Sequence, residues 1–230
     1  MKRLIFFDID GTLTRTQNGY IPFNEAVFKT FGIRGDIRSV IPDGNTDPRI
    51  VEDIFAQASL KLSIDEGQWA QFSINLRDCY SNAVGQGATT IRALPGVSEL
   101  LRHLGETDNF ICSVVTGNLE TTATVKLQAA QLSAYLCRGA YGSDSPRRTD
   151  LPLIAKQRCE QLSQESIPLD QCVIVGDTLK DLKAARQNDM KCILVGTGRY
   201  PIEELRLSQP DGCLADLCDT AEVVKALNTV

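Results

Sequence analysis

The chain has 230 residues, of which 43% are apolar and 23% are charged. This composition is ordinary for a globular protein and predicts a sizeable hydrophobic core rather than a disordered chain. The net charge of −5 argues against nonspecific binding to nucleic acid or to an anionic membrane surface.

The apolar stretches of the sequence are too short for a signal-peptide core or a membrane span, so we expect neither. The eight cysteines lie mostly in apolar patterns, which indicates buried, reduced thiols. A zinc site is not expected, because the chain has a single histidine and no suitably spaced ligands. Together these features predict a cytoplasmic protein.

The first predicted element is an apolar strand over residues 3–7. Asp8 and Asp10 follow it directly, and Gly11 supplies the backbone freedom for a turn. Both acids are therefore predicted just past the carboxyl edge of a sheet, where open α/β proteins bind ligands. Two carboxylates held close together repel each other unless a proton or a cation lies between them. The pair thus favours a divalent-metal site with oxygen ligands.

The chain then changes to helical patterns, with no strand signal between them. Asp47 followed by Pro48 is typical of an N-cap with proline at the first helical position. Ser63 and Glu66 resemble a capping box at the start of another helix. The three helices predicted in this part of the chain cover residues 24–31, 47–62 and 65–82.

This helical block is bounded by polar turns at residues 14–19 and 85–87. We interpret residues 15–88 as an inserted cap domain on two hinges, and residues 1–14 and 89–230 as an α/β core. The alternative interpretation is a helical subdomain that does not move.

Strand and helix signals alternate in the rest of the chain. This alternation predicts an α/β fold, a Rossmann-like, doubly wound parallel sheet with helices on both faces and an all-helical insertion. The strands are predicted over residues 110–115, 139–142, 172–175, 191–195 and 213–214. The helices are predicted over residues 97–104, 119–132, 151–162, 179–187, 202–207 and 220–227.

Polar motifs end two of these strands. Thr116 follows the strand 110–115, and Thr116 or Asn118 is alternatively the N-cap of the next helix. Asp177 follows the strand 172–175, with Asp181 four residues later at the start of a helix. We expect Asp177 and Asp181 to converge on the rim that carries the first two acids. The alternative for Asp181 is an acid that complements the helix dipole.

The stretch Asp-Ile-Asp-Gly-Thr-Leu at residues 8–13 resembles the first motif of the haloacid-dehalogenase-like hydrolases, most of which are phosphatases. The helical insertion resembles the caps of phosphoglycolate-phosphatase-like members. Three further pieces belong to the family: a Ser or Thr after a second strand, a basic residue and a late acidic pair. All three can be assigned in the expected order, so the resemblance runs from Asp8 to Asp181. It implies a Mg²⁺-dependent phosphatase that acts on a small phosphate monoester.

The resemblance implies that Asp8 is the nucleophile and forms an aspartyl-phosphate. A carboxylate suits this role because it is ionised at neutral pH. Asp10 would protonate the leaving alkoxide and then take a proton from the hydrolytic water. The implied Mg²⁺ ligands are Asp8, Asp10 through its backbone carbonyl, Asp177 and Asp181. This set fits Mg²⁺, which prefers few carboxylates together with waters and a substrate phosphate.

Phosphate binding is assigned to Thr116 and to the backbone N–H groups of Gly117 and Asn118, where a helix begins. A phosphoryl group also needs a fixed cation to balance the charge that builds on its oxygens. Arg148 best fits the place of the family's basic residue, before the helix 151–162, although Lys is commoner there. The full set of candidates is Arg147, Arg148 and Lys156.

Two other stretches carry weaker signals. Residues 44–47 resemble a Gly-x-Thr-Asp stretch in the caps of phosphoglycolate-phosphatase-like members, and they are equally compatible with a helix cap. Residues 196–201 contain half of a dinucleotide-binding fingerprint, but a proline stands in place of its third glycine, so we reject that interpretation.

Two alternatives to the phosphatase stay open. A sugar-phosphate mutase of the same family would keep every motif and return the phosphoryl group. A non-catalytic module that binds a phosphate ligand would keep the fold. The sequence leaves the ester open among phosphoglycolate, a sugar phosphate and a nucleoside monophosphate, and it does not indicate the oligomeric state.

Overall fold

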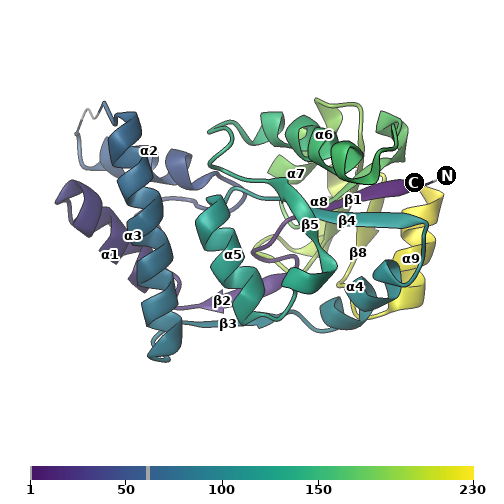
Figure 1. Cartoon of the computed structure of the whole chain (residues 1–230), viewed down its shortest axis with the longest axis horizontal. Coiled ribbons are helices and arrows are strands. Elements are labelled where there is room, and N and C mark those ends of the chain that lie inside the picture. Colours follow the sequence, from purple (N-terminus) through teal and green to yellow (C-terminus); the bar gives the residue numbers. More distant parts are fainter. Residues whose placement is uncertain (1, 61–62) are drawn as a thin grey trace.

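The computed structural model describes residues 2–60 and 63–230. Its centre is a six-stranded sheet with the order β5-β4-β1-β6-β7-β8, in which every neighbouring pair is parallel (Figure 1). The strands are β1 (Arg3–Phe7), β4 (Phe110–Val115), β5 (Cys137–Ala140), β6 (Cys172–Gly176), β7 (Lys191–Val195) and β8 (Gly212–Leu214). The predicted parallel α/β sheet is therefore confirmed.

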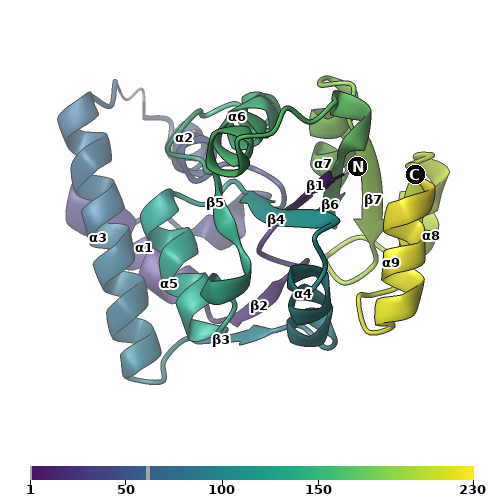
Figure 2. The ribbon, with the colours of Figure 1, turned by 45° about the vertical axis from the view of Figure 1, so that its right-hand side comes forward.

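The central strand β1 explains why the sheet needs helices on both faces. Leu4 and Phe6 pack into one hydrophobic cluster with α6, α7 and α8, whereas Ile5 and Phe7 pack into another with α4, α5 and α9. Because alternate side chains of a strand point to opposite faces, a strand covered on both sides reads as a continuous apolar run. Figure 2 shows α6 and α4 on opposite sides of β4.

Six helices cover the sheet, and most of their bounds agree with the sequence prediction to within one or two residues. They are α4 (Val97–Gly105), α5 (Glu120–Ala129), α6 (Leu151–Ser163), α7 (Leu179–Arg186), α8 (Ile202–Leu207) and α9 (Thr220–Thr229). One difference is larger, since α5 ends three residues before its predicted end. Among the strands, β5 lies two residues earlier in the chain than predicted.

The polar turns predicted on either side of the helical block are wrong in part. Thr14–Gln17 forms β2, which pairs antiparallel with β3 (Thr90–Ala93) in a separate two-stranded ribbon. The sequence Thr-Arg-Thr-Gln has no apolar alternation, so it carries no strand signal of its own. These residues are extended because of their partner, and the partner is about 75 residues away in the chain.

Three helices lie between β2 and β3 and share a hydrophobic cluster. The rings of Phe31 and Phe55 meet edge to face at 5.2 Å, and those of Phe23 and Phe72 at 5.9 Å. Figure 1 shows these helices together at one end of the molecule, beside α5. They are α1 (Tyr20–Phe31), α2 (Asp47–Gln57) and α3 (Glu66–Gly85).

The helix starts in this block differ from the predicted ones. Thr46, rather than Asp47, is the N-cap of α2, and Asp47 is the first helical residue. The capping box of α3 is made by Asp65 and Gln68 instead of Ser63 and Glu66, because Asp65 lies at the N-cap position. The helix predicted over residues 47–62 ends at Gln57, and residues 61–62 lie outside the described chain.

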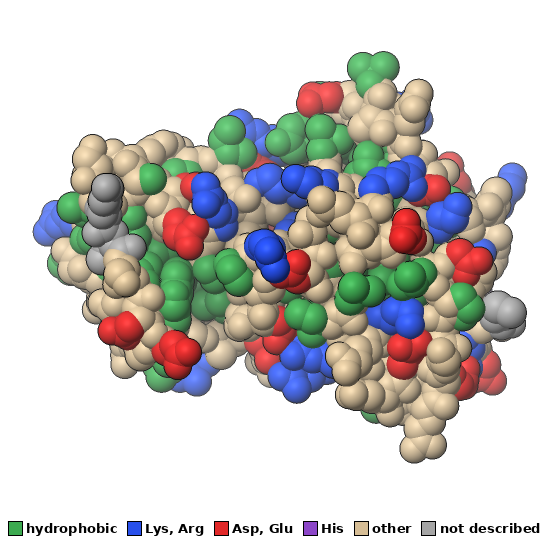
Figure 3. Space-filling model, turned by 90° about the horizontal axis from the view of Figure 1, so that it is seen from above, with side chains coloured by type: hydrophobic (Ala, Val, Ile, Leu, Met, Phe, Trp, Pro, Cys, Tyr) green, Lys and Arg blue, Asp and Glu red, His purple; other side chains and the backbone are tan. Residues whose placement is uncertain are grey.

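Among the described residues, no helix is long and apolar enough to cross a membrane. Figure 3 shows basic and acidic side chains interspersed over one face of the molecule. All eight cysteines are free thiols, and Cys218 is the exposed one among them.

Candidate active site

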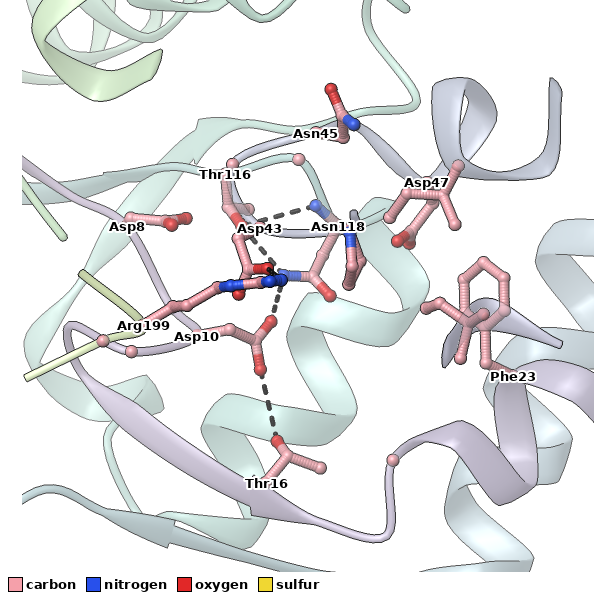
Figure 4. Close-up of a pocket in the computed structure, with 18 of the residues that line it drawn as sticks. Asp8, Asp10, Thr16, Phe23, Asp43, Asn45, Asp47, Thr116, Asn118 and Arg199 are labelled. Carbon is pink, nitrogen blue, oxygen red and sulfur yellow. Dashed lines mark hydrogen bonds and ion pairs between the residues drawn. The ribbon is translucent and has the colours of Figure 1, made fainter. Parts of the chain in front are cut away.

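Three neighbouring strands bring the predicted motifs to one edge of the sheet. Asp8 follows β1, Thr116 follows β4 and Asp177 follows β6, and the order β4-β1-β6 makes these strands adjacent. The three side chains line one cavity of about 580 Å³ together with Asp10 and Arg148. Figure 4 shows Asp8, Asp10 and Thr116 around this cavity.

Three acids form a tight cluster beside the cavity. Carboxylate oxygens of Asp8, Asp177 and Asp181 lie within 4.8 Å of one another, and all three side chains are buried. Burial raises the pKa of Asp8 to about 6, although the charge of Arg148 opposes this shift. Burial, together with the other two acids, raises the pKa of Asp177 to about 8. Such a group of oxygen ligands suits a hard divalent cation.

The carboxylate of Asp177 is held by the turn after β1 and by the loop after β7. Thr12 donates its hydroxyl hydrogen to Asp177 Oδ1 at 3.1 Å. Gly11 has a φ of +81° and lies so close that a Cβ there would be 2.5 Å from Asp177 Oδ2. A Cβ at Gly198 would overlap the same oxygen. The rejected fingerprint at residues 196–201 therefore has a different role, since Gly198 leaves room for the acid.

Asp181 lies with the other acids and also caps a helix, so both predictions for its position hold. Its Oδ2 accepts hydrogen bonds from the hydroxyl of Thr178 at 2.7 Å and from the Thr178 N–H at 3.1 Å, which completes a capping box at the start of α7. Its Oδ1 accepts a hydrogen bond from Arg148. Asp181 is thus an N-terminal acid of α7 and also a member of the acidic cluster.

Arg148 is the basic candidate that the fold brings to the acids. It is 8% exposed and lies directly before α6, where Nη2 is 3.2 Å from Asp8 Oδ2 and also pairs with Asp181. Arg147 is exposed and pairs with Asp150, and Lys156 pairs with Glu160 at 2.6 Å along α6. Within the described chain, the buried Nε of Arg148 has no hydrogen-bond partner.

Asn118 links Thr116 to Asp10, and neither residue caps the next helix. The hydroxyl of Thr116 accepts a hydrogen bond from Asn118 Nδ2 at 2.9 Å, and the same nitrogen donates to Asp10 Oδ2 at 2.8 Å. The N-cap position of α5 is Leu119, whose N–H donates to Asp47 Oδ2 at 2.8 Å. The helix-cap alternative for Thr116 and Asn118 is therefore wrong.

Asp10 lies in a second charged group, which includes a lysine that the sequence analysis missed. Lys126 Nζ is 2.6 Å from Asp10 Oδ2 and donates to Asn118 Oδ1 at 2.7 Å. Thr16 donates to Asp10 Oδ1 at 3.2 Å. The surrounding protein disfavours a charge on Asp10, but Lys126, Asn118 and Thr16 outweigh this effect and lower the pKa of Asp10. Its side chain is thus separate from the acidic cluster, and the metal contact of its backbone carbonyl stays a prediction.

A signal for Lys126 is present in the sequence. Leu119, Ala123 and Ala130 lie on the buried face of the predicted helix, and Lys126 falls on the same face by helical spacing. A charged residue on a buried helix face indicates a buried partner.

The loop before α2 closes the cavity from the side of the helical block. Asp47 N–H donates to Gly117 O at 2.8 Å, and the hydroxyl of Thr46 donates to Pro146 O at 2.8 Å. Gly44 has a φ of +68° and packs against Thr178, where a Cβ would be 2.5 Å from its hydroxyl. Burial raises the pKa of Asp47 to about 6. The stretch 44–47 therefore combines a helix cap with contacts to the loops at the carboxyl edge of the sheet.

Most of the chain matches a known family of proteins. Residues 2–189 match the family described as haloacid dehalogenase-like hydrolase, which is most of the chain. The chain belongs to this family, as its first motif predicts.

Individual relatives indicate which class of enzyme within the family the chain resembles. The chain is 35% identical to a 5′-nucleotidase of Pseudomonas aeruginosa, covering 96% of this chain and 95% of that one. It is 27% identical to the probable phosphatase IndB of Dickeya dadantii, covering 91% and 88%. A predicted phosphoglycolate phosphatase from Haemophilus somnus has a similar fold, with a TM-score of 0.68 at 22% identity over 97% and 98% of the two chains. The protein is a phosphoric monoester hydrolase of this family.

Proposed function

We propose that the protein is a Mg²⁺-dependent phosphatase that hydrolyses a small phosphate monoester through an aspartyl-phosphate on Asp8. The observation that carries this proposal is the buried cluster of Asp8, Asp177 and Asp181 beside Arg148 and Thr116 at the ends of adjacent strands. One arginine does not neutralise three clustered carboxylates, so the cluster fits a divalent cation. When bound, Mg²⁺ supplies positive charge to the phosphoryl oxygens.

The reaction has two half-reactions. In the first, a carboxylate oxygen of Asp8 attacks phosphorus, and the bond from phosphorus to the ester oxygen breaks. Asp10 gives a proton to that oxygen, so the substrate leaves as a neutral alcohol. In the second, Asp10 takes a proton from water, which attacks the same phosphorus. The products are inorganic phosphate and the free carboxylate of Asp8.

Three groups are proposed to bind the phosphoryl oxygens: the hydroxyl of Thr116, the backbone N–H groups of Gly117 and Asn118, and the guanidinium of Arg148. The unpartnered Nε of Arg148 supports its assignment, because a buried donor without an acceptor is costly and a phosphate oxygen would satisfy it. Arg148 rather than Lys156 is proposed as the phosphate-binding cation, since Lys156 pairs with Glu160.

We propose that residues 15–88 form a cap over a core of residues 1–14 and 89–230. The separate hydrophobic cluster of α1, α2 and α3 supports this division, and the ribbon of β2 and β3 joins the two parts. Cap side chains such as Phe23 and Tyr80 line the cavity and would contact the organic part of the ester. The cavity volume of about 580 Å³ leaves room for more than a phosphate group.

The substrate proposed for the first test is a nucleoside 5′-monophosphate. The name of the Pseudomonas aeruginosa relative and the aromatic cap residues support it, because a nucleobase stacks on aromatic rings. Phosphoglycolate and sugar phosphates belong in the same panel of substrates.

The test compares wild type with Asp8→Asn on p-nitrophenyl phosphate and on this panel, with Mg²⁺ and with EDTA. Wild type is expected to release inorganic phosphate only with Mg²⁺, and Asp8→Asn is expected to be inactive while keeping its circular-dichroism spectrum. Turnover by Asp8→Asn at the wild-type rate would refute the nucleophile. An isomerised phosphoester without phosphate release would indicate the mutase, and tight binding without turnover would indicate the non-catalytic module.

A further inference from the structure

Two cysteine thiols lie in contact with each other outside the cavity. Cys137 begins β5, and Cys159 lies in α6, the helix next to that strand (Figure 2). Their Sγ atoms are 3.4 Å apart, close enough for one thiol to donate a hydrogen bond to the other. Because Cys137 begins a strand of a parallel sheet, it lies at the amino edge, whereas the acids lie at the carboxyl edge. The pair is therefore separate from the groups of the proposed reaction.

The neighbouring cysteines are not placed to pair with either thiol. Cys112 precedes Ser113, which is the register partner of Cys137, so the side chain of Cys112 points to the opposite face of the sheet. Cys112 accordingly packs in a different hydrophobic cluster from Cys159. Cys172 packs in the same cluster as Cys159, but its thiol donates to a backbone carbonyl at 3.5 Å. Cys137 and Cys159 are thus left as partners of each other.

The two thiols differ in exposure and in acidity. Cys137 is partly exposed, whereas Cys159 is buried. The hydrogen bond with Cys159 lowers the pKa of the Cys137 thiol to about 7, although burial opposes this shift. The same contact raises the pKa of the Cys159 thiol. Peroxides react with the thiolate form of accessible cysteines, so Cys137 is the member of the pair that an oxidant in solution would meet first.

The fold holds α6 close to β5 at this point. Arg158, which precedes Cys159, donates to Gly139 O at 2.6 Å, two residues after Cys137. A disulfide bond is about 2.0 Å long, so the two sulfur atoms would have to approach by about 1.4 Å. Rotation of both side chains about their Cα–Cβ bonds can supply an approach of this size. The bond would close a loop over residues 137–159, the segment that carries Arg148.

We propose that Cys137 and Cys159 form a reversible oxidation site, at which hydrogen peroxide converts the two thiols into a disulfide between β5 and α6. First, the thiolate of Cys137 attacks one peroxide oxygen and the O–O bond breaks. Cys137 becomes a sulfenic acid, and the other oxygen leaves as hydroxide, which takes up the proton that Cys137 released. Then the sulfur of Cys159 attacks the sulfur of Cys137, the S–O bond breaks, and the hydroxyl leaves as water with the proton of Cys159. Two thiols are oxidised by two electrons, and one peroxide is reduced to two waters.

The test treats folded, reduced wild type with hydrogen peroxide after the reductant has been removed. The chain is expected to lose about 2 Da, the mass of two hydrogens, and peptide mapping without reductant is expected to link Cys137 to Cys159. Dithiothreitol is expected to restore both thiols to alkylation. Cys218 is expected to be alkylated throughout, although it is exposed, because its hydrogen bond with Asp216 raises the pKa of its thiol.

Two variants separate the steps. Cys137→Ser is expected to form no disulfide and to leave Cys159 reduced, because the buried thiol is not reached by the oxidant. Cys159→Ala is expected to stop at a sulfenic acid on Cys137, which dimedone traps. It is also expected to react about tenfold more slowly, because the pKa of Cys137 rises when the hydrogen bond is lost and each pKa unit changes the thiolate fraction about tenfold.

Cys213→Ser is the matched control. Cys213 is partly exposed, as Cys137 is, and the variant is expected to form the disulfide at the wild-type rate. Circular dichroism before and after oxidation checks that each variant is folded. A link between Cys159 and Cys172 in folded protein, or a Cys137 thiol that stays reduced after Cys218 has been oxidised, would overturn the inference.

The outcome does not depend on the proposed function. Asp8→Asn, which is expected to be inactive as a phosphatase, is expected to form the same disulfide, because neither cysteine is among the described residues that line the cavity. Activity of Asp8→Asn would refute the nucleophile and leave the oxidation site intact. Absence of the disulfide in both wild type and Asp8→Asn, once Cys218 is oxidised, would refute the oxidation site alone.

Discussion

Two charged groups lie at the cavity, and they differ in how far the protein balances their charge. In the first group, Asp8, Asp177 and Asp181 lie together, and Arg148 pairs with Asp8 and with Asp181. In the second, Asp10 is matched by Lys126 and by hydrogen bonds from neutral side chains. The raised pKa values of Asp8 and Asp177 and the lowered pKa of Asp10 follow from this difference.

This difference in charge balance explains why the two groups have different roles in the proposed reaction. A group with excess negative charge has affinity for a metal ion and, through it, for a phosphoryl group. A balanced group is already stable in the absence of ligand and can hold one side chain in a fixed orientation. Changes in the first group should therefore act mainly on metal dependence, and changes in the second on geometry and stability.

The largest effect is expected from Asp177→Asn, which removes one carboxylate from the first group. We expect kcat on p-nitrophenyl phosphate to fall by about 10³-fold or more, because a bound metal contributes several kcal/mol of charge stabilisation in the transition state. The measurement is a Mg²⁺ titration of activity, paired with thermal unfolding in phosphate with Mg²⁺ or EDTA. Wild type is expected to be stabilised by Mg²⁺ with phosphate, and the variant is expected to lose this stabilisation. An unchanged Mg²⁺ response in the variant would show that Asp177 is not a ligand of the metal.

A smaller loss is expected from Gly198→Ala, which disturbs the first group without changing its charge. The new methyl group would overlap Asp177 Oδ2 and push the carboxylate from its place. We expect activity to fall by about 100-fold, since a small displacement of a catalytic group has an effect of this size. Gly105→Ala, at the end of α4 with open space around it, is the matched control and is expected to keep full activity. Equal activity of the two variants would show that Gly198 is not required to leave this space.

The last effect concerns Asp47, near the second group, and it appears in stability rather than in activity. Burial raises the pKa of Asp47 from its ordinary value of 3.8 to about 6. The folded state therefore binds more protons than the unfolded state between these values, so this group makes wild type less stable as pH rises from about 4 to 6. Asp47→Asn lacks this dependence and keeps an oxygen for the Leu119 N–H. Relative to wild type, it is expected to gain up to about 3 kcal/mol between pH 4 and pH 7, since a tenfold change in proton affinity corresponds to about 1.4 kcal/mol.

Urea unfolding of wild type and Asp47→Asn at several pH values provides this measurement. A stability difference that stays constant with pH, or one that changes in the opposite direction, would contradict the burial of an uncompensated acid at this position.

These residues also differ in whether the sequence alone predicts their place at the site. Asp8 and Asp177 follow apolar runs that predict buried strands, so their place at a sheet edge is a local property of the chain. Gly198 carries no such signal, and the helical spacing of Lys126 indicates a buried partner without identifying it. Gly198 matters only because Asp177 is packed against it, and Lys126 matters only because Asp10, 116 residues earlier, lies beside it.

By itself, the sequence determined the α/β class, most of the core elements and the residues that end its strands. These features depend on hydrophobic periodicity and on turn residues, which act over a few neighbouring positions. The tertiary structure decided the pairing of β2 with β3, the approach of Arg148 to Asp8 and the partner of Asp10. These features depend on contacts between distant segments, and the free energy of a buried charge or a polar strand is set by the partner that the fold brings to it.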